Sequence, residues 1–332
     1  MQQVLSGFLK AFILGCFSYV ALAQGPGNAI NFTGANNIVE IADNGSLDVN
    51  DSVTIEAWVY PTGTDSYNGI VSKSLFTDAF HGSAYVLRLY DNTARIQFWI
   101  SRDGEETGSY ITTSAGALII NQWNHIAVQF ASSQFTRMYI NGALDIERTD
   151  AVIDTIFNSS ESFRIGKNNN AAENSFPGMI DEVRIWNAVL DVSTLQSWRK
   201  KTLIASHPNF SNLVGYWKFD EGSGTTTADG SGGGNTGTLV NSPAWVISTA
   251  PLDLGSIGGM KWNDANGNGV KELGENTLSN WKIRLAGAKT DSQLTDVNGN
   301  YSFTELFEGS YTVSEELQST WTQTAPPVTR NV

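Results

Sequence analysis

The chain is poor in cysteine and in positive charge. Its one cysteine, Cys16, cannot form a disulfide within the chain. Lysine and arginine number 20 against 33 aspartate and glutamate residues, which gives a formal net charge of -13. Basic residues cluster only at positions 199–201, whereas binding a phosphate backbone requires many cations on one face. These shortages argue against nucleic acid, an anionic membrane surface and a disulfide framework.

The first two dozen residues predict an export signal. Lys10 precedes the apolar run AFILGCFSYVALA, which is short for a membrane span, and residues 21–23 supply a small-x-small cleavage site. We therefore expect residues 1–23 to be removed and the mature chain to be secreted or exposed on the cell surface. A second interpretation takes ILGC as a lipoprotein box with a lipidated Cys16, although Lys10 leaves only a short apolar stretch before it. Because an exported chain without disulfides lacks that means of stabilisation, we expect bound calcium to stabilise the fold instead.

Short apolar runs alternate with turns rich in glycine and asparagine from residue 28 to about residue 247. The run SVTIEAWVYP places apolar residues on one face, and WNHIAVQF does the same. AYVLRLYDNTARIQFWIS predicts two strands around Asp91 and Asn92, Asn141-Gly142 predicts a hairpin, and DVSTLQSWRK predicts one short helix. Many short strands at this spacing predict an all-β sandwich of jelly-roll type over residues 24–250.

Six motifs carry a family resemblance in this segment. They follow in the order AINFTGANNIVEI, VTIEAWVYP, QWNHIAVQF, MYINGAL, GMIDEVRIWNAVLDVSTLQ and LVGYWKFDEGSGTTTADGSGGGNTGTL. Together they resemble the laminin G-like, concanavalin A-like jelly-roll domains that are common on bacterial surface proteins. The resemblance implies a sandwich with a concave sheet, often one calcium ion, and a role in binding carbohydrate or protein.

The resemblance also implies that Asp181 is a calcium ligand, completed largely by backbone carbonyls near the N-terminal strand. The sequence departs from the family at Thr33, where an aspartate is common, and at residues 36–37, where two asparagines replace a frequent acidic pair. The alternative is that Asp181 only accepts hydrogen bonds from a turn.

The sequence lacks the pattern of catalytic carboxylates that is expected of a hydrolase. Related laminarinase-type enzymes place carboxylates at i, i+2 and i+4 of one strand, so that all of them face the sugar. Here Glu56 is flanked at i±2 by Thr54 and Trp58, and Asp181 is followed at i+2 by Val183. The three histidines are scattered: His81, His125 and His207. We therefore predict a binding protein and not an enzyme.

Aromatic residues on or near the predicted strands are candidates for stacking on sugar rings. These residues are Trp58, Tyr60, Tyr67, Tyr85, Trp99 and Tyr110. The alternative is that they fill the core of the sandwich. The expected partner is an extracellular glycan or a surface protein, without nucleic acid and without a membrane span in the mature chain.

Residues 251–332 form a second predicted domain, after a hinge at ISTAPLDLGSIGG. Its stretch DANGNGVKELGE, residues 264–275, has an acidic first residue, asparagine at the third and fifth places, glycine at the sixth and glutamate at the twelfth. This is the oxygen-ligand spacing of a Ca²⁺ loop. The predicted ligands are Asp264, Asn266, Asn268, the carbonyl of Val270, and Glu275, with Asp296 contributing to the same or a neighbouring ion. The alternative is a loop that binds nothing.

This second segment resembles the B-type repeat of serine-aspartate-repeat surface proteins, a relative of collagen-adhesin stalk modules. The resemblance rests on WNDANGNG…GE followed by TDVNGNYSF, and it implies a small Ig-like or prealbumin-like β-sandwich clipped by Ca²⁺. Such a repeat normally finishes with a further strand after WTQTAPP, so one hypothesis is that the module is incomplete. We expect an exported binding protein with a laminin G-like recognition domain on a calcium-stiffened stalk module. The alternative function is the non-catalytic carbohydrate-binding part of a larger polysaccharide-degrading enzyme.

Overall fold

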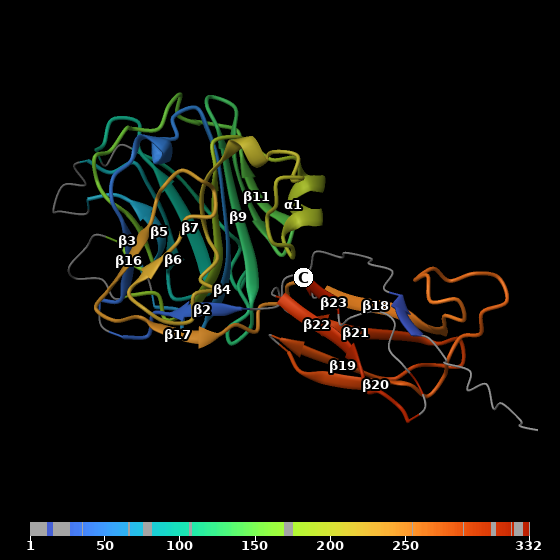
Figure 1. Cartoon of the computed structure of the whole chain (residues 1–332). Coiled ribbons are helices and arrows are strands. Elements are labelled where there is room, and N and C mark those ends of the chain that lie inside the picture. Colours follow the sequence, from blue (N-terminus) through green and yellow to red (C-terminus); the bar gives the residue numbers. More distant parts are fainter. Residues whose placement is uncertain are drawn as a thin grey trace, which may run out of the picture. The chain divides into compact units, whose positions relative to one another are not determined.

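The computed structural model describes residues 12–15, 27–34, 36–65, 67–75, 82–105, 108–168, 175–253, 255–287, 289–306, 310–319, 321 and 328–331. The chain divides into two compact units (Figure 1). One unit comprises residues 26–251, and the other comprises residues 252–332 together with the N-terminal segment. Within the described ranges, no helix has both the length and the apolar character needed to cross a bilayer.

Two antiparallel eight-stranded sheets build the first unit. The order in one sheet is β11-β10-β9-β4-β13-β2-β17, with β14 also paired to β13, and the order in the other is β15-β16-β3-β12-β5-β6-β7-β8. The strands of the first sheet are β2 (Asn28–Asn31), β4 (Ser52–Pro61), β9 (Asn124–Ala131), β10 (Phe135–Ile140), β11 (Ala143–Arg148), β13 (Gly178–Trp186), β14 (Leu213–Trp217) and β17 (Ala244–Ile247). Those of the second are β3 (Ile38–Ile41), β5 (Gly69–Lys73), β6 (Tyr85–Tyr90), β7 (Arg95–Ile100), β8 (Ser109–Thr112), β12 (Phe163–Ile165), β15 (Thr226–Thr227) and β16 (Gly237–Val240).

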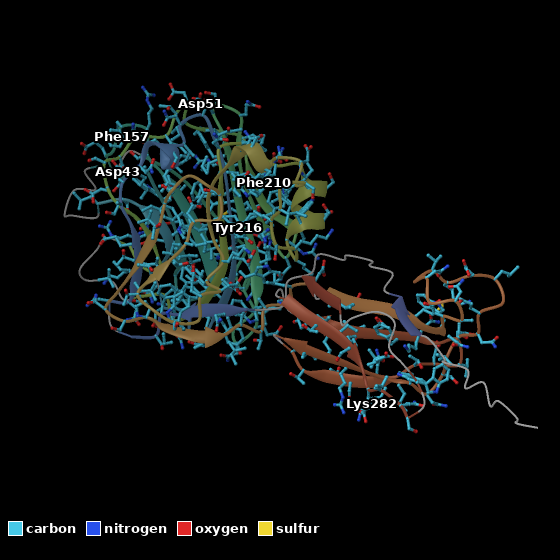
Figure 2. All side chains as sticks on the ribbon, in the orientation of Figure 1. Asp43, Asp51, Phe157, Phe210, Tyr216 and Lys282 are labelled. Atoms are coloured by element: carbon cyan, nitrogen blue, oxygen red, sulfur yellow. The ribbon has the colours of Figure 1, made fainter. Side chains whose placement is uncertain are left out.

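Side chains from both sheets fill the space between them (Figure 2), and alternate positions of each strand supply them. The inward face of β4 is formed by buried apolar residues, namely Val53, Ile55, Ala57 and Val59. On the opposite sheet, Leu87 and Leu89 of β6 enter the same core. The predicted jelly-roll sandwich is therefore confirmed.

Local turn signals lie where the sequence predicts them. Asp91 and Asn92 have positive φ angles of 57° and 58° between β6 and β7, and Asn141 and Gly142, at 53° and 82°, join β10 to β11. In the two-residue hairpin at Asn141 and Gly142, positive φ at both residues matches the right-handed twist of the strands. The predicted helix is α1 (Val192–Trp198); Asp191 occupies its N-cap position without a side-chain capping bond. Short 3-10 turns occur at Gly45–Leu47 and Phe210–Asn212.

The second unit is a smaller β-sandwich. One sheet has the order β1-β18-β21 and the other has the order β20-β19-β22-β23. The strands are β1 (Phe12–Gly15), β18 (Gly255–Asn263), β19 (Lys282–Gly287), β20 (Asp291–Leu294), β21 (Asn300–Leu306), β22 (Ser310–Glu315) and β23 (Val328–Asn331). Its core contains Ile257, Trp281, Ile283, Leu285, Tyr301, Phe303, Leu306, Tyr311 and Val313. A strand, β23, does follow the WTQTAPP motif, and the all-β fold class is confirmed for both units.

Strand β1 lies inside the segment predicted to be an export signal. It pairs antiparallel with β18, with Phe12 opposite Asn263 and Gly15 opposite Met260. The remainder of residues 1–23, including Cys16 and the predicted cleavage site, lies outside the described residues.

Candidate functional site

The outer side of strands β6 to β8 carries a polar ladder between two groups of aromatic rings. Because Leu87, Phe98 and Ile111 point into the core, their strand neighbours point outward. The register places Arg88 opposite Gln97 and Gln97 opposite Thr112. We call this surface the aromatic face, defined by Tyr67, Val86, Arg88, Tyr90, Gln97, Trp99, Tyr110 and Thr112.

Hydrogen bonds fix the ladder across three strands. Arg88 Nε and Nη2 both donate to Oε1 of Gln97, at 3.1 and 2.8 Å. Nε2 of Gln97 donates in turn to the hydroxyl of Thr112 at 3.4 Å. Arg88 and Gln97 are nearly enclosed, with 9% and 4% of their surfaces exposed. The ladder is therefore held in place before any ligand arrives.

Aromatic rings flank the ladder on both sides. On one side the guanidinium carbon of Arg88 lies 4.7 Å from the centre of the Tyr67 ring, which meets Tyr90 edge-on at 5.8 Å. On the other side Trp99 pairs with Tyr110 across β7 and β8. Tyr67 and Tyr110 present 42% and 56% of their surfaces to solvent. Exposed rings beside fixed hydrogen-bonding groups are the combination that recognises a sugar.

Only three of the six predicted aromatic residues belong to this face: Tyr67, Trp99 and Tyr110. Of these, Tyr67 and Tyr110 are exposed, whereas Trp99 is buried against Val86, with 6% of its surface exposed. For Tyr85 the alternative of a core position holds, because the residue is 1% exposed and lies on the inward side of β6. Trp58 is not available to a sugar either, because its indole is buried and donates to the Arg199 carbonyl at 2.8 Å. Tyr60 lies on the other sheet, edge-on to Trp123 at 5.6 Å. Sequence analysis missed Arg88, Gln97 and Thr112, although the alternation in YVLRLY and RIQFWI marks the first two as outward-facing.

A β-bulge on β13 sets the environment of Asp181. Asp181 pairs with Trp58 and Arg184 pairs with Glu56, so residues 182 and 183 share one partner position on β4. Glu182 accordingly has a φ of 51°, and the extra residue brings its carboxylate beside Arg184, at 2.6 Å. A regular strand would place Asp181 and Glu182 on opposite sides of the sheet, and the bulge breaks this alternation.

The carboxylate of Asp181 is buried, with 1% of the residue exposed. One oxygen accepts from the Ser248 hydroxyl at 2.6 Å and the other from the Glu182 amide at 2.8 Å. Burial raises the pKa of Asp181 well above its usual value. The negative charge of Glu182 is the next cause, and that of Asp220 adds to the effect. A cation would relieve this penalty, so the residue fits a calcium ligand. Among the described residues, however, no group of three or more Asp, Glu, His or Cys could complete such a site, so further ligands would have to be carbonyl, amide or hydroxyl oxygens.

The predicted calcium loop of the second unit is arranged around Asp264. This residue is 0% exposed, and its carboxylate accepts from the amides of Gly267 and Asn268, at 2.8 and 3.2 Å, and from that of Gly269 at 3.2 Å. Asn266 accepts from the Asn268 amide at 3.0 Å. These bonds wrap the loop around its first residue.

The far end of the loop closes onto its beginning. Asn268 accepts from the amide of Val270 at 2.8 Å, and Glu275 accepts from the amide of Ala265 at 2.9 Å. Glu275, at the twelfth position of the loop, therefore contacts the backbone of the second position. The carboxylate, amide and carbonyl oxygens of the loop are ligand types that suit Ca²⁺. Asp296 belongs to a separate turn, where it accepts from the amides of Asn298 and Asn300 at 2.9 and 2.7 Å.

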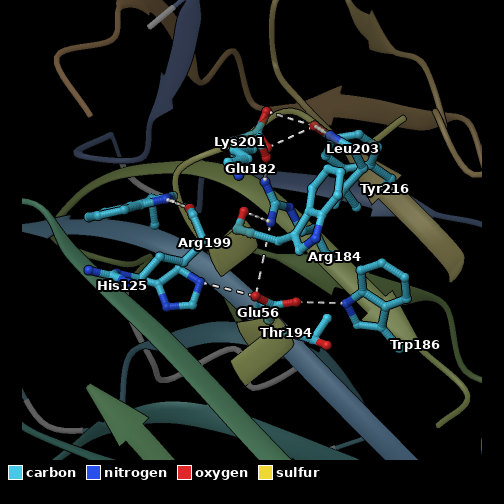
Figure 3. A network of polar contacts seen from close by, with 12 residues as sticks. Glu56, His125, Glu182, Arg184, Trp186, Thr194, Arg199, Lys201, Leu203 and Tyr216 are labelled. Atoms are coloured by element: carbon cyan, nitrogen blue, oxygen red, sulfur yellow. Dashed lines mark hydrogen bonds and ion pairs between the residues drawn. The ribbon is translucent and has the colours of Figure 1, made fainter. Parts of the chain in front are cut away.

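A network of buried charged residues lies on the outer side of the first sheet (Figure 3). Glu56 accepts from Trp186 at 2.8 Å and meets His125 at 3.2 Å. Burial alone would raise the pKa of Glu56, but the His125 hydrogen bond and the charge of Arg184 outweigh it and hold the pKa below its usual value. Arg184 also meets Glu182, which accepts from the Tyr216 hydroxyl at 2.7 Å.

Residues of α1 and of the segment after it enclose this network, since Leu195, Leu203 and Tyr216 pack with Trp186 in one apolar cluster. A substrate has no access to Glu56 or Glu182 in this arrangement. His125 is a packed, hydrogen-bonded residue. His207 stacks on Trp186 with 4.6 Å between ring centres, whereas His81 lies outside the described residues.

Comparison with known domain families agrees with both units. Residues 33–196 match the model of the concanavalin A-like lectin/glucanases superfamily, of the Laminin_G_3 type, and residues 255–331 match the SdrD B-like domain. The chain joins a laminin G-like domain to an SdrD B-like domain. Both resemblances expected from the sequence motifs are therefore confirmed.

Relatives of known name match part of the chain. Serine-aspartate repeat-containing protein D of Staphylococcus aureus is 32% identical over 122 residues, which are 35% of this chain and 9% of that protein. Serine-aspartate repeat-containing protein F of Staphylococcus epidermidis is 35% identical over 72 residues, 21% of this chain and 4% of that protein. The matched region thus spans less than a tenth of these relatives.

Among solved structures, a candidate carbohydrate-binding protein from Bacteroides ovatus superposes with a TM-score of 0.54 and 22% identity, covering 69% of this chain and 62% of that one. At this identity the likeness supports the fold alone.

Proposed function

We propose that this chain is an exported surface protein that binds a glycan through the aromatic face of its laminin G-like domain and carries that domain on an SdrD B-like module stiffened by calcium. The observation that carries the proposal is the pair of exposed rings, Tyr67 and Tyr110, which lie on either side of the fixed polar ladder of Arg88, Gln97 and Thr112. A ladder held in advance lowers the entropy lost when a ligand binds. The matched superfamily takes its name in part from lectins, and for that reason we propose a glycan as the ligand class.

A glycan array probed with residues 24–250 is the first test of this function. We expect Tyr67→Ala and Tyr110→Ala each to weaken binding several-fold, because an aromatic contact contributes about 0.5–1.5 kcal/mol beyond its buried area. Gln97→Ala should weaken it further, since Arg88 loses the acceptor that orients it. Leu144→Ala, at a residue 51% exposed on β11, is the matched control and should leave binding unchanged. Equal binding by all four variants would refute the aromatic face as the site.

Calcium is the proposed cofactor at the 264–275 loop and at Asp181. Asp181→Asn separates the two interpretations of the buried carboxylate, because it retains the shape of the side chain and removes its charge. If the residue holds Ca²⁺, the variant should melt at a lower temperature and the first domain should lose its response to chelation. A variant that is as stable as the parent chain, with unchanged calcium content, would leave Asp181 only its hydrogen bonds to Ser248 and to the Glu182 amide.

We also propose a binding role without catalysis. The support is that Glu56 and Glu182 are enclosed beneath α1 and the segment that follows it. Hydrolysis of a glucan by the purified chain, abolished by one carboxylate substitution, would overturn this part of the proposal.

A further inference from the structure

Strand β18 has two neighbours, and one of them is the N-terminal strand β1. On the other side β18 pairs with β21, where Met260 lies opposite Asn300. The Lys261 amide donates to the Gly299 carbonyl at 2.8 Å, and the Lys261 carbonyl accepts from the Leu278 amide at 2.9 Å. The hydrogen-bonding groups of Lys261 therefore face away from β1.

Successive residues of a strand point their amides and carbonyls to opposite edges. Met260 and Trp262 therefore point these groups the opposite way from Lys261, towards β1. The register agrees, because Ile13 lies opposite Trp262 and Gly15 lies opposite Met260. The four-residue segment FILG thus covers two donors and two acceptors of β18. If the leader is removed on export, these groups lie on an open sheet edge, which is a template for another strand.

We propose that the β18 edge, Met260–Asn263, is a strand-binding site that is covered by the leader in the precursor and by an uncharged, apolar extended segment of another protein after export. The inference rests on the export part of the proposed function and is independent of glycan and calcium binding. The chemistry of the occupant follows from β1, which contributes only Phe, Ile, Leu and Gly. Main-chain bonds supply the affinity in this mode of recognition, and alternate side chains supply the specificity.

A hollow beside this edge provides a place for one such side chain. It has a volume of about 250 Å³ and lies over β18 and β21, lined by Ser256, Gly258, Gly259, Met260, Asn300, Tyr301 and Ser302. Gly258 contributes no side chain between its same-side neighbours Ser256 and Met260. An incoming strand that continues two residues beyond the position of Gly15 would run past Gly258, where one large apolar side chain could fill the hollow.

Amide hydrogen exchange measured by NMR tests the proposal on two proteins, residues 1–332 and residues 24–332. We expect the amides of Met260 and Trp262 to exchange at least tenfold faster in the shorter protein. The amides of Lys261 and Asn263 should not change, because they already donate to Gly299 and Asn276. Adding a synthetic peptide of residues 10–17, with Cys16→Ser, should restore protection at Met260 and Trp262.

Two N-methylated peptides provide the matched control. Methylation at Ile13 removes a donor that faces β18 and should abolish the protection, whereas methylation at Leu14 removes a donor that faces away and should preserve it. Equal behaviour of the two peptides, or no peptide effect at all, would overturn the proposal. Protection that appears without peptide and rises with protein concentration would also overturn it, because the occupant would be a second copy of the chain. Glycan binding by residues 24–250 is unaffected by any of these outcomes, so failure here is distinguishable from failure of the proposed function.

Discussion

Single residues in the first domain hold strained or buried positions that the surrounding structure stabilises. Glu182 adopts a φ of 51°, which non-glycine residues seldom occupy. The ion pair with Arg184 and the hydroxyl of Tyr216 compensate for that strain by satisfying the carboxylate. Next to this group, His125 and His207 are packed against aromatic rings, and burial lowers the pKa of each below its usual value.

The first prediction concerns pH. Burial lowers the pKa of His207 from 6.5 to about 4, and burial also lowers the pKa of His125. Since the unfolded chain takes up these protons first, the free energy of unfolding should fall as the pH drops from about 6.5 towards 4. His207→Phe preserves a ring beside Trp186 without a titrating group, so its unfolding free energy should fall less steeply in that window. Urea denaturation of residues 24–250 at several pH values measures both slopes, and identical slopes would contradict the prediction.

The second prediction concerns an ion pair in the second domain. Lys261 of β18 and Glu315 of β22 are buried, with 0% and 1% of their side chains exposed, and they contact each other. Lys261→Met alone leaves a carboxylate buried without its cation and should cost about 3–5 kcal/mol of unfolding free energy. The double variant Lys261→Met with Glu315→Leu should recover most of that loss, because two apolar side chains need no pairing. Chemical denaturation of residues 24–332 checks this, and a double variant as unstable as the single one would rule out the explanation.

At the scale of elements, the 264–275 loop is a long excursion stabilised mainly by its own side chains. Asp264 and Glu275, the first and last residues of the loop, accept hydrogen bonds from the backbone amides of Gly267 and Ala265. Exposed apolar residues, Val270 at 58% and Leu273 at 106%, show that little of the loop packs on the sandwich. A bound ion would therefore contribute a large share of its order.

The third prediction concerns calcium in this loop. A site with a Kd of about 10⁻⁴–10⁻³ M would add about 1.4 kcal/mol when calcium is roughly tenfold above Kd. EGTA should then lower the melting transition of the second domain and expose the loop to protease. Glu275→Gln should reproduce the effect in calcium buffer, and Asn266→Ala should do so more mildly. Asp291→Asn, at an exposed residue outside the loop, is the control. Cleavage and melting that are identical with calcium and with EGTA would show that the loop is only a turn.

At the scale of the whole molecule, two units have separate cores. Among the described residues, none of the apolar clusters of the first unit shares a residue with the core of the second. Thr249, close to the boundary at residues 251–252, accepts a hydrogen bond from Trp123 at 3.0 Å, which fixes the end of the first unit to its own sheet. Separate cores allow each unit to unfold by itself.

The fourth prediction follows from this division. Calorimetry of residues 24–332 should show two transitions, and removing residues 251–332 should abolish one of them. Glycan affinity of residues 24–250 should equal that of the longer protein, since the aromatic face lies wholly on β6 to β8 and Tyr67. One merged transition, or a marked loss of affinity on truncation, would show that the units depend on each other.

Much of the fold follows from the sequence by itself. Alternation in SVTIEAWVYP and RIQFWI determines which side chains enter the core, because successive residues of a strand face opposite ways. Asn141-Gly142 and Asp91-Asn92 determine two turns, since these residues tolerate positive φ. The spacing of DANGNGVKELGE places the proposed calcium ligands on one loop because all of them are local.

Only the tertiary structure decided which distant residues meet. Arg88, Gln97 and Tyr67 become neighbours through the register of β6 on β7 and through a loop outside those strands, and no local pattern specifies a register. The bulge at Asp181 and Glu182 redirects a carboxylate to Arg184, although the sequence there reads as a regular strand. Tyr85 is buried because its side of β6 faces the core. Trp58 is buried because its side of β4 is covered by the end of α1, where its indole meets Arg199. Long-range pairing fixes each of these contacts, whereas sequence periodicity carries only the conformation of one segment at a time.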